Sequence, residues 1–228
     1  MNKESSYNFY QLVEKNLNSR KVLKSSEFGE LKAPLFGESL NILYEISTCV
    51  PTCRGGNHVL EAIAGRCFNH AIASYRLISD CLFDESLNLT RSIAEITNLM
   101  FLLNESETLM ESWICSDKKK RMREFSPAAV RKALEDLGVP CPISQSAYSE
   151  LCELATHVTP ETKPNRHDSA DKIVGYIGGN INDAVGRKVA IEKLLLYVSL
   201  SAMVISKIFG MQSNVEALAK LGNNAFSA

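Results

Sequence analysis

Apolar residues along this chain recur mainly at the spacing of an α-helix. The clearest example lies in residues 58–81, where eight apolar side chains share one face of a 3.6-residue wheel. They are Leu60, Ile63, Ala64, Cys67, Phe68, Ala71, Tyr75 and Ile78. Such a stripe predicts an amphipathic helix that packs on a core. The same pattern predicts long helices over 84–103 and 183–210. Shorter helices are expected over 6–24, 35–48, 105–116, 144–157 and 214–221.

Residues that cap or break helices divide these segments. Ser126, followed by Pro127, predicts a helix start, and Gly138 its end. Asn57 and Ser213 are also expected as N-caps. We interpret 25–34 as a linker and 158–182 as a polar loop, in which 172–177 is the one short strand candidate.

Together these elements predict an all-α fold. The core is a helical bundle around the three long helices 58–81, 84–103 and 183–210. We expect an N-terminal helical extension over 1–56 and a bundle domain over 57–228.

Composition narrows the class of protein. Of 228 residues, 45% are hydrophobic and 22% charged, and the net charge is −1, which excludes a disordered chain and a strongly basic one. The seven cysteines are odd in number and irregularly spaced, as is typical of reduced thiols. The most apolar stretch, 194–206, is shorter than the roughly 20 residues that span a bilayer. With no apolar core for a signal peptide at the N-terminus, we expect a soluble cytoplasmic protein without a membrane partner.

One stripe of polar residues crosses the otherwise apolar helix 84–103. Its members are Asp84, Asn88, Arg91, Glu95 and Asn98, at spacings of 4, 3, 4 and 3. Arg91 and Glu95 can form an ion pair across one helical turn. Three interpretations stay open: a solvated face with a surface ion pair, a buried structural network, or a functional cleft.

Two segments resemble a known group of proteins. The run 86–99 (SLNLTRSIAEITNL) resembles the arginine-and-glutamate helix of a bacterial helical family of unknown function. Residues 148–157 (YSELCELATH) are similar to its tyrosine-to-histidine segment. That family is loosely grouped with the HEPN-like proteins. The resemblance implies a HEPN-like helical bundle, a homodimer, and an RNA- or nucleotide-directed role in bacterial defence or toxin–antitoxin systems.

Many HEPN proteins are metal-independent ribonucleases, which would require a base and a cation at the reacting phosphate. Their motif is an arginine followed a few residues later by a histidine. Arg66 and His70, with three intervening residues, have a shorter spacing. We therefore expect His157 as base, Arg91 as cation and Glu95 to orient Arg91, with Arg66 and His70 as the alternative pair. His157 is also explained as a favourable residue near a helix C-terminus.

A basic cluster offers a second contact to nucleic acid. Its members are Lys118, Lys119, Lys120, Arg121 and Arg123. They could hold a phosphate backbone, although a charge run is also typical of a solvated helix end.

Metal ligation has weaker support in the sequence. Cys49 and Cys53 have a spacing that can bind zinc, and His58 follows, but no fourth ligand is evident. His58 and Glu61 have the reverse order of the Glu-x-x-His motif of helical di-iron sites, and there is no second copy. We therefore predict no metal and no cofactor.

The sequence favours an RNA- or nucleotide-directed protein that acts as a metal-independent ribonuclease if it is catalytic. The alternative is a non-enzymatic helical adaptor or sensor, in which the polar stripe binds a small ligand or a partner protein.

Overall fold

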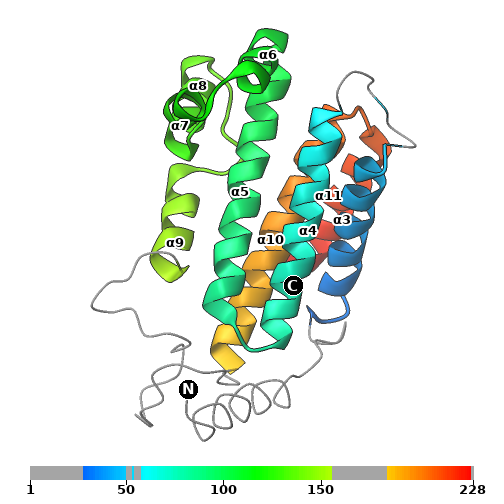
Figure 1. Cartoon of the computed structure of the whole chain (residues 1–228). Helices are drawn as coiled ribbons and strands as arrows, with labels where there is room; N and C mark the ends of the chain where they lie inside the picture. The colour runs from blue at the N-terminus through cyan, green and yellow to red at the C-terminus, as the bar shows by residue number, and fades with distance from the viewer. Residues whose placement is uncertain (1–27, 50–52, 54–57, 156–183, 227–228) are drawn as a thin grey trace, which may run out of the picture.

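The computed structural model describes residues 28–49, 53, 58–155 and 184–226. Within these ranges the chain forms helices and no strand, so the predicted all-α bundle is confirmed (Figure 1). The helices are α3 (Lys32–Ser47), α4 (Val59–Ser79), α5 (Phe83–Glu105), α6 (Glu107–Cys115), α7 (Lys118–Glu124), α8 (Pro127–Asp136), α9 (Gln145–Ala155), α10 (Ala184–Ile208) and α11 (Gln212–Phe226). The predicted helix 6–24, the loop 158–182 and the strand candidate 172–177 lie outside the described residues.

The core lies where α4, α5 and α10 pack together, as the sequence predicted. Leu87 and Ile93 of α5, Ala64 of α4 and Leu194 of α10 are fully buried there. Each buried leucine or isoleucine side chain contributes about 1.5–3 kcal/mol relative to an exposed one. The bundle is therefore held mainly by apolar contacts along its three long helices.

Small hydroxyl residues join these helices inside the core. Thr97 of α5 and Ser201 of α10 lie with their side-chain oxygens 2.5 Å apart. Ser74 of α4 and Ser86 of α5 make a similar contact at 2.7 Å. Three of these hydroxyls also lie within hydrogen-bond distance of a backbone carbonyl, so the four buried polar groups all have partners.

The residues before α4 share this core. Phe28 and Phe36 stack with their ring centroids 4.7 Å apart, and Phe36 lies 6.2 Å from the ring of Tyr75 in α4. Helix α3 packs on α4, α10 and α11. The described residues from Phe28 to Ile46 therefore belong to the same core as the long helices, and the linker expected over 25–34 includes the first residues of α3. The expected division into an extension over 1–56 and a bundle over 57–228 stays a prediction.

Helix α10 is the most apolar helix of the described chain. It contains a span, Val185–Ile208, that is long and apolar enough to cross a membrane by composition, with a mean hydropathy of 1.7. In the structure, 67% of an 18-residue stretch of this span is buried inside the bundle. This burial agrees with the expected buried helix and is typical of a core helix in a soluble protein.

Helices α7, α8 and α9 lie to one side of α5, and α6 lies at the upper end of α5 (Figure 1). Leu102 of α5 packs with Val130 and Leu134 of α8 in a small second core near one end of the bundle. From there the chain returns along α5, so that α9 packs against that helix. This arrangement brings the polar stripe of α5 beside α9.

The ends of α4, α8 and α11 can be compared with the capping residues that the sequence predicted. Ser126 accepts a hydrogen bond from the Ala129 amide at 3.4 Å, and Gly138 has a φ of +69°, as the predicted cap and end of α8 require. The N-cap of α4 is His58 rather than Asn57. Ser213 lies inside α11, which begins at Gln212, so it is not the cap.

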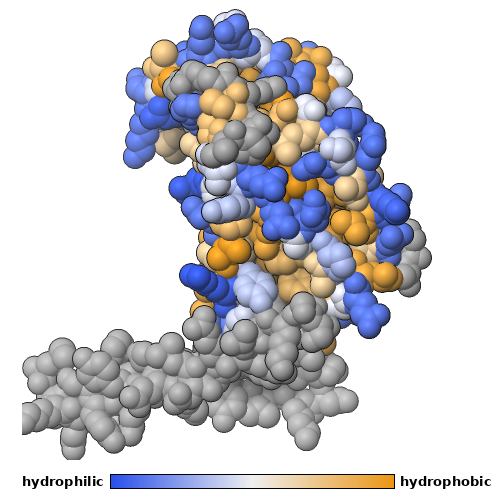
Figure 2. Space-filling model, turned by 90° about the vertical axis from the view of Figure 1, so that its right-hand side faces the viewer, coloured by the Kyte–Doolittle hydropathy of each residue, from blue (hydrophilic) through white to orange (hydrophobic). Residues whose placement is uncertain are grey.

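Figure 2 shows one face of the molecule, turned by 90° about the vertical axis from the view of Figure 1. Hydrophilic residues predominate at its upper end, and hydrophobic and hydrophilic residues alternate below. The exposed hydrophobic side chains of the described residues are scattered over several helices, including Tyr44, Met122 and Phe226. Scattered exposure of this kind is ordinary for a protein surface.

Candidate functional site

The polar stripe of α5 is divided between two roles. Asn98 is 4% exposed and fixes the backbone of Ile143, donating to its carbonyl and accepting from its amide, both at 2.9 Å. This residue therefore ties the segment between α8 and α9 to α5. The rest of the stripe, from Asp84 to Glu95, is half-buried rather than fully solvated.

Arg91 and Glu95 form the predicted ion pair, and Tyr148 of α9 completes it. The guanidinium Nη1 lies 3.6 Å from Glu95 Oε1. The Tyr148 hydroxyl donates to the same carboxylate oxygen at 2.8 Å and accepts from Arg91 Nη1 at 3.3 Å. Three groups from two helices thus form a closed ring of contacts, which we call the α5–α9 cluster.

Burial and hydrogen bonding set the protonation state of this cluster. Burial raises the pKa of Tyr148 well above its ordinary value, and the hydrogen bond to Glu95 raises it further. The hydroxyl therefore stays protonated at neutral pH and acts as a donor. It cannot serve as a general base there.

A second arginine reaches the same tyrosine from α8. The guanidinium carbon of Arg131 lies 4.4 Å from the centroid of the Tyr148 ring, and that of Arg91 lies 5.9 Å from it. The Nε–H groups of both arginines are buried and have no acceptor among the described residues. A buried donor without an acceptor calls for an explanation, such as a water or an anion bound between the groups.

The sequence did not point to all members of this site. Cys152 lies one turn after Tyr148 on α9 and is 3.9 Å from Arg91 Nη1, and the i, i+4 spacing is a signal that could have found it. Arg131 carries no such signal, because it is 17 positions from Tyr148 and only the fold brings the two together.

The predicted histidines differ in what the structure describes. His157 lies outside the described residues, two positions past the end of α9. Arg66 and His70 lie one turn apart on α4, where Arg66 is exposed and His70 half-buried. Burial lowers the pKa of His70, and the positive charge of Arg66 lowers it further, so the ring is neutral at pH 7.

The basic cluster forms the short helix α7, capped by Asp117. Three of its five cations have partners within the protein. Arg121 donates to the carbonyl of Ser116, Lys120 lies 3.1 Å from the Ser112 hydroxyl, and Arg123 pairs with Glu124 at 2.6 Å. Lys118 and Lys119 are exposed. As a contact to nucleic acid, the cluster therefore offers mainly these two lysines.

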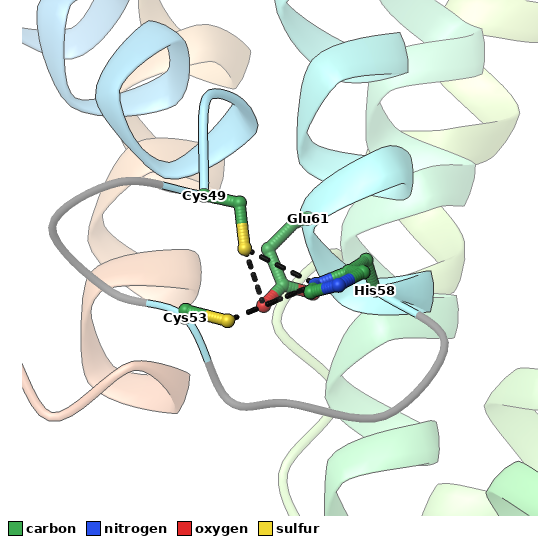
Figure 3. Close-up of side chains that lie close together, drawn as sticks. All are labelled: Cys49, Cys53, His58 and Glu61. Carbon is green, nitrogen blue, oxygen red and sulfur yellow. Dashed lines mark hydrogen bonds and ion pairs between the residues drawn. The ribbon is translucent and has the colours of Figure 1, made fainter.

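A second cluster lies at the junction of α3 and α4, and we call it the Cys–His–Glu cluster (Figure 3). Cys49 follows the end of α3, Cys53 lies in the connection, and His58 and Glu61 stand at the start of α4. One ligand atom from each of the four lies within 4.8 Å of all the others. Glu61 adds a fourth group that could ligate a metal, and the sequence alone did not place it beside the two cysteines.

The Cys–His–Glu cluster has an unusual backbone and partial burial. Cys49 and His58 have φ values of 59° and 52°, which are left-handed conformations that non-glycine residues rarely adopt. Glu61 is 3% exposed, whereas Cys53 and His58 are exposed. A hydrogen bond with Cys53, partial burial and the charges of Cys53 and Glu61 raise the pKa of Cys49 to about 11.

One hollow of about 590 Å³ lies elsewhere, between the start of α3 and the end of α11. It is lined by Phe28, Leu31, Lys32 and Phe226 among others, and includes no residue of either cluster. Its lining offers no group suited to acid–base chemistry beyond Glu30 and Lys32.

Comparisons with protein-family models, with curated proteins and with solved structures find no match for this chain. The HEPN-like relationship that the sequence suggests therefore stays a prediction.

Proposed function

We propose that this chain is an RNA- or nucleotide-directed protein that binds phosphate at the α5–α9 cluster. The observation that supports this most is the pair of guanidinium groups, from Arg91 and Arg131, at the ring of Tyr148. Arginine grips phosphate oxygens through paired N–H donors, and two arginines at one point favour an anion.

The neighbours of Arg91 suit it for this role. Glu95 and Tyr148 hold one side of the guanidinium, so that its planar fork is fixed before a ligand arrives. A side chain held in place loses less conformational freedom on binding. The ion pair between Arg91 and Glu95 therefore positions the cation while offsetting part of its charge.

Catalysis is the finer part of this proposal. In it, His157 takes the proton of a ribose 2′-hydroxyl, Arg91 stabilises the charge that develops on the phosphate, and Glu95 orients Arg91. No metal takes part in this reaction. The lysines of α7, Lys118 and Lys119 above all, would extend the contact along the RNA backbone.

The biological setting follows from the resemblance rather than from the site. In this proposal the protein acts in the cytoplasm as part of a bacterial defence or toxin–antitoxin system, and two copies associate through their long helices.

Binding tests the first part. We would measure the affinity for a fluorescent single-stranded RNA and for a nucleoside triphosphate by anisotropy, over a series of salt concentrations. A charged hydrogen bond is worth about 1.5–3 kcal/mol, so Arg91→Ala and Arg131→Ala should each weaken binding roughly 10- to 100-fold. The salt slope should fall by about 1 for each phosphate that a variant no longer neutralises. Lys132→Ala, the exposed neighbour of Arg131 on α8, is the matched control and should bind as the native chain does.

Cleavage tests the second part. The native chain and His157→Ala are incubated with RNA, with and without a chelator, and the products are separated on a denaturing gel. Cleavage that persists with chelator and disappears in the variant would support the ribonuclease mechanism. If both arginine variants bind RNA and nucleotide as the native chain does, the phosphate site itself is wrong.

The second candidate function is a non-enzymatic adaptor or sensor. It is favoured by the closed contacts of Arg91, Glu95 and Tyr148, which suit binding better than turnover. Binding that depends on the two arginines, without any cleavage, would select this function.

A further inference from the structure

We propose that Cys49, Cys53, His58 and Glu61 form a Zn²⁺ site that joins α3 to α4. The two thiolates, one imidazole nitrogen and one carboxylate oxygen make up a complete set of four ligands. Zinc binds these three ligand types, and structural zinc sites are almost always four-coordinate. The site shares no residue with the α5–α9 cluster, so the zinc proposal and the phosphate-binding proposal can be tested independently.

The spacing of the ligand atoms fits a tetrahedral ion. Metal–ligand distances near 2.0–2.3 Å place tetrahedral ligands roughly 3.3–3.8 Å from one another. Cys49 Sγ lies 3.1 Å from His58 Nδ1 and 3.7 Å from Glu61 Oε1. His58 Nδ1 lies 3.9 Å from Cys53 Sγ and 4.0 Å from Glu61 Oε1. Shifts of a few tenths of an ångström would bring these four distances into the range of one tetrahedral ion. The remaining two pairs, Cys53 with Cys49 and Cys53 with Glu61, lie within 4.8 Å of each other.

The backbone holds the ligands in this arrangement. Cys49 and His58, both left-handed, are two of the three non-glycine residues with positive φ in the described chain. Strained backbone of this kind persists where the surrounding structure demands it, often at binding sites. Next to the cluster, Gly65 of α4 lets α3 come close, because a Cβ there would lie 3.2 Å from the Cβ of Ser47.

The ligand set selects zinc among the common metals. Magnesium and calcium take oxygen ligands, and iron–sulfur clusters are held by four cysteines in most cases. Two sulfurs with one nitrogen and one oxygen suit a borderline-soft ion of tetrahedral geometry. Since all four positions are filled by the protein, no open position remains for a catalytic water, and the site is structural.

Burial is graded across the site. Glu61 is buried at the base of the cluster, on the first turn of α4, while Cys53 and His58 face solvent. A zinc ion would therefore cover the Glu61 carboxylate and remain within reach of a chelator. Bound there, it would link the end of α3 to the start of α4 across 13 residues of chain, 49–61.

Metal content and cobalt spectroscopy test the site on the full chain under reducing conditions. We would measure zinc per chain by mass spectrometry, remove it with a chelator, and titrate Co²⁺, whose thiolate charge-transfer and tetrahedral d–d absorption bands report the ligands. Competition with Zn²⁺ then gives the zinc affinity. We expect one zinc per chain and the bands of a tetrahedral site with two sulfurs.

Ligand variants complete the test. Even partners outside the ligand shell are worth about 10- to 100-fold in affinity, so Cys53→Ser should weaken zinc binding by more than about 100-fold. Cys115→Ser, at an exposed cysteine on α6, is the matched control and should bind as the native chain does. Cys53 is exposed and outside the helices, and circular dichroism would verify that the variant folds. His58→Ala provides an independent second variant with the same expected loss.

Two results would overturn the proposal. One is a native chain that takes up Co²⁺ without the charge-transfer bands of thiolate ligands. The other is zinc binding of equal strength in the native chain, Cys53→Ser and His58→Ala, since the four residues would then not be the ligands.

Discussion

The two clusters are assembled in opposite ways. All four members of the Cys–His–Glu cluster come from 13 consecutive residues, 49–61, at one helix junction. In the α5–α9 cluster, Arg91 meets Tyr148 across 57 positions, and Arg131 joins them from α8. The first cluster therefore depends on the local course of the backbone, and the second on the packing of three helices.

Their electrostatics differ as well. In the α5–α9 cluster, Arg91 Nη1, the Glu95 carboxylate and the Tyr148 hydroxyl contact one another, while the Nε–H of Arg91 has no acceptor among the described residues. At the Cys–His–Glu cluster, the Cys49 thiol faces a second thiol and a carboxylate, both of which raise its pKa. The Cys–His–Glu cluster brings two sulfurs, one nitrogen and one carboxylate oxygen within 4.8 Å of one another, which suits a metal ion, whereas the α5–α9 cluster contains a cation of its own, Arg91, beside Glu95.

The largest loss of stability is expected when the segment before α9 is no longer bonded to α5. Asn98→Ala removes both hydrogen bonds to the backbone of Ile143, which is 2% exposed. Leaving buried polar groups without partners should lower the free energy of unfolding by about 2–4 kcal/mol. Urea unfolding followed by circular dichroism measures this change.

The control for this prediction is Asn224→Ala on the exposed surface of α11, which should change stability by no more than a few tenths of a kcal/mol. Zinc affinity should be the same in Asn98→Ala as in the native chain. A weaker zinc affinity in this variant would show that the two clusters are coupled, and would contradict the view that they are assembled independently.

Zinc itself should have the next largest effect. At a free zinc concentration 100 times its dissociation constant, binding to the folded state adds about 2.7 kcal/mol. For a chain of this size the melting temperature should rise by roughly 5–11 °C. Thermal melts with zinc and with chelator would measure the shift, which should be absent in Cys53→Ser and retained in Cys115→Ser. Equal melting with zinc and with chelator in the native chain would contradict it.

The same contrast explains how much of the molecule could be predicted from its sequence. The long helices were predicted because apolar residues such as Leu60, Ala64 and Ala71 repeat at helical spacing. The pairing of Arg91 with Glu95 was predicted because it spans one turn. Helix α7 was not predicted as a separate element, since its charges carry no apolar pattern.

Both clusters contain members that the sequence did not reveal, for different reasons. Arg131 joins Tyr148 only through the path of the chain from α8 to α9, which no periodicity encodes. In the sequence, His58 and Glu61 have the reverse order of a Glu-x-x-His motif, and this spacing does not indicate that Glu61 lies beside Cys49. Its place beside Cys49 depends on left-handed residues at both ends of the junction.

A smaller loss of stability is expected when one contact within the α5–α9 cluster is removed. Tyr148→Phe removes the hydroxyl that links Glu95 and Arg91 but keeps the ring beside Arg131. Because the pair is partly exposed, we expect the free energy of unfolding to fall by about 1 kcal/mol. A double-mutant cycle with Glu95→Ala, which removes the acceptor of the Tyr148 hydroxyl, should give a coupling energy of about 0.5–1.5 kcal/mol. Purely additive effects would show that the hydroxyl bond to Glu95 contributes nothing.

The smallest expected effect concerns the close approach of α3 and α4 beside the Cys–His–Glu cluster. Replacing a helical glycine by alanine usually stabilises a helix by about 0.8–1.0 kcal/mol. Gly222→Ala in α11 should gain this amount, since no atom lies within 4 Å of the added Cβ. At Gly65 the new Cβ would lie 3.2 Å from the Cβ of Ser47, so most of the gain should disappear.

Zinc affinity should distinguish the Gly65→Ala and Gly222→Ala variants more clearly than stability does. If Gly65→Ala pushes the end of α3 away from α4, it should weaken zinc affinity several-fold, whereas Gly222→Ala should leave it unchanged. Calorimetric titration of both variants with zinc would measure the difference. Equal zinc affinity and equal stability in the two variants would mean that α3 yields without moving Cys49. In that event the geometry of the ligands would be set by the left-handed backbone at Cys49 and His58 alone, and not by the contact between the helices.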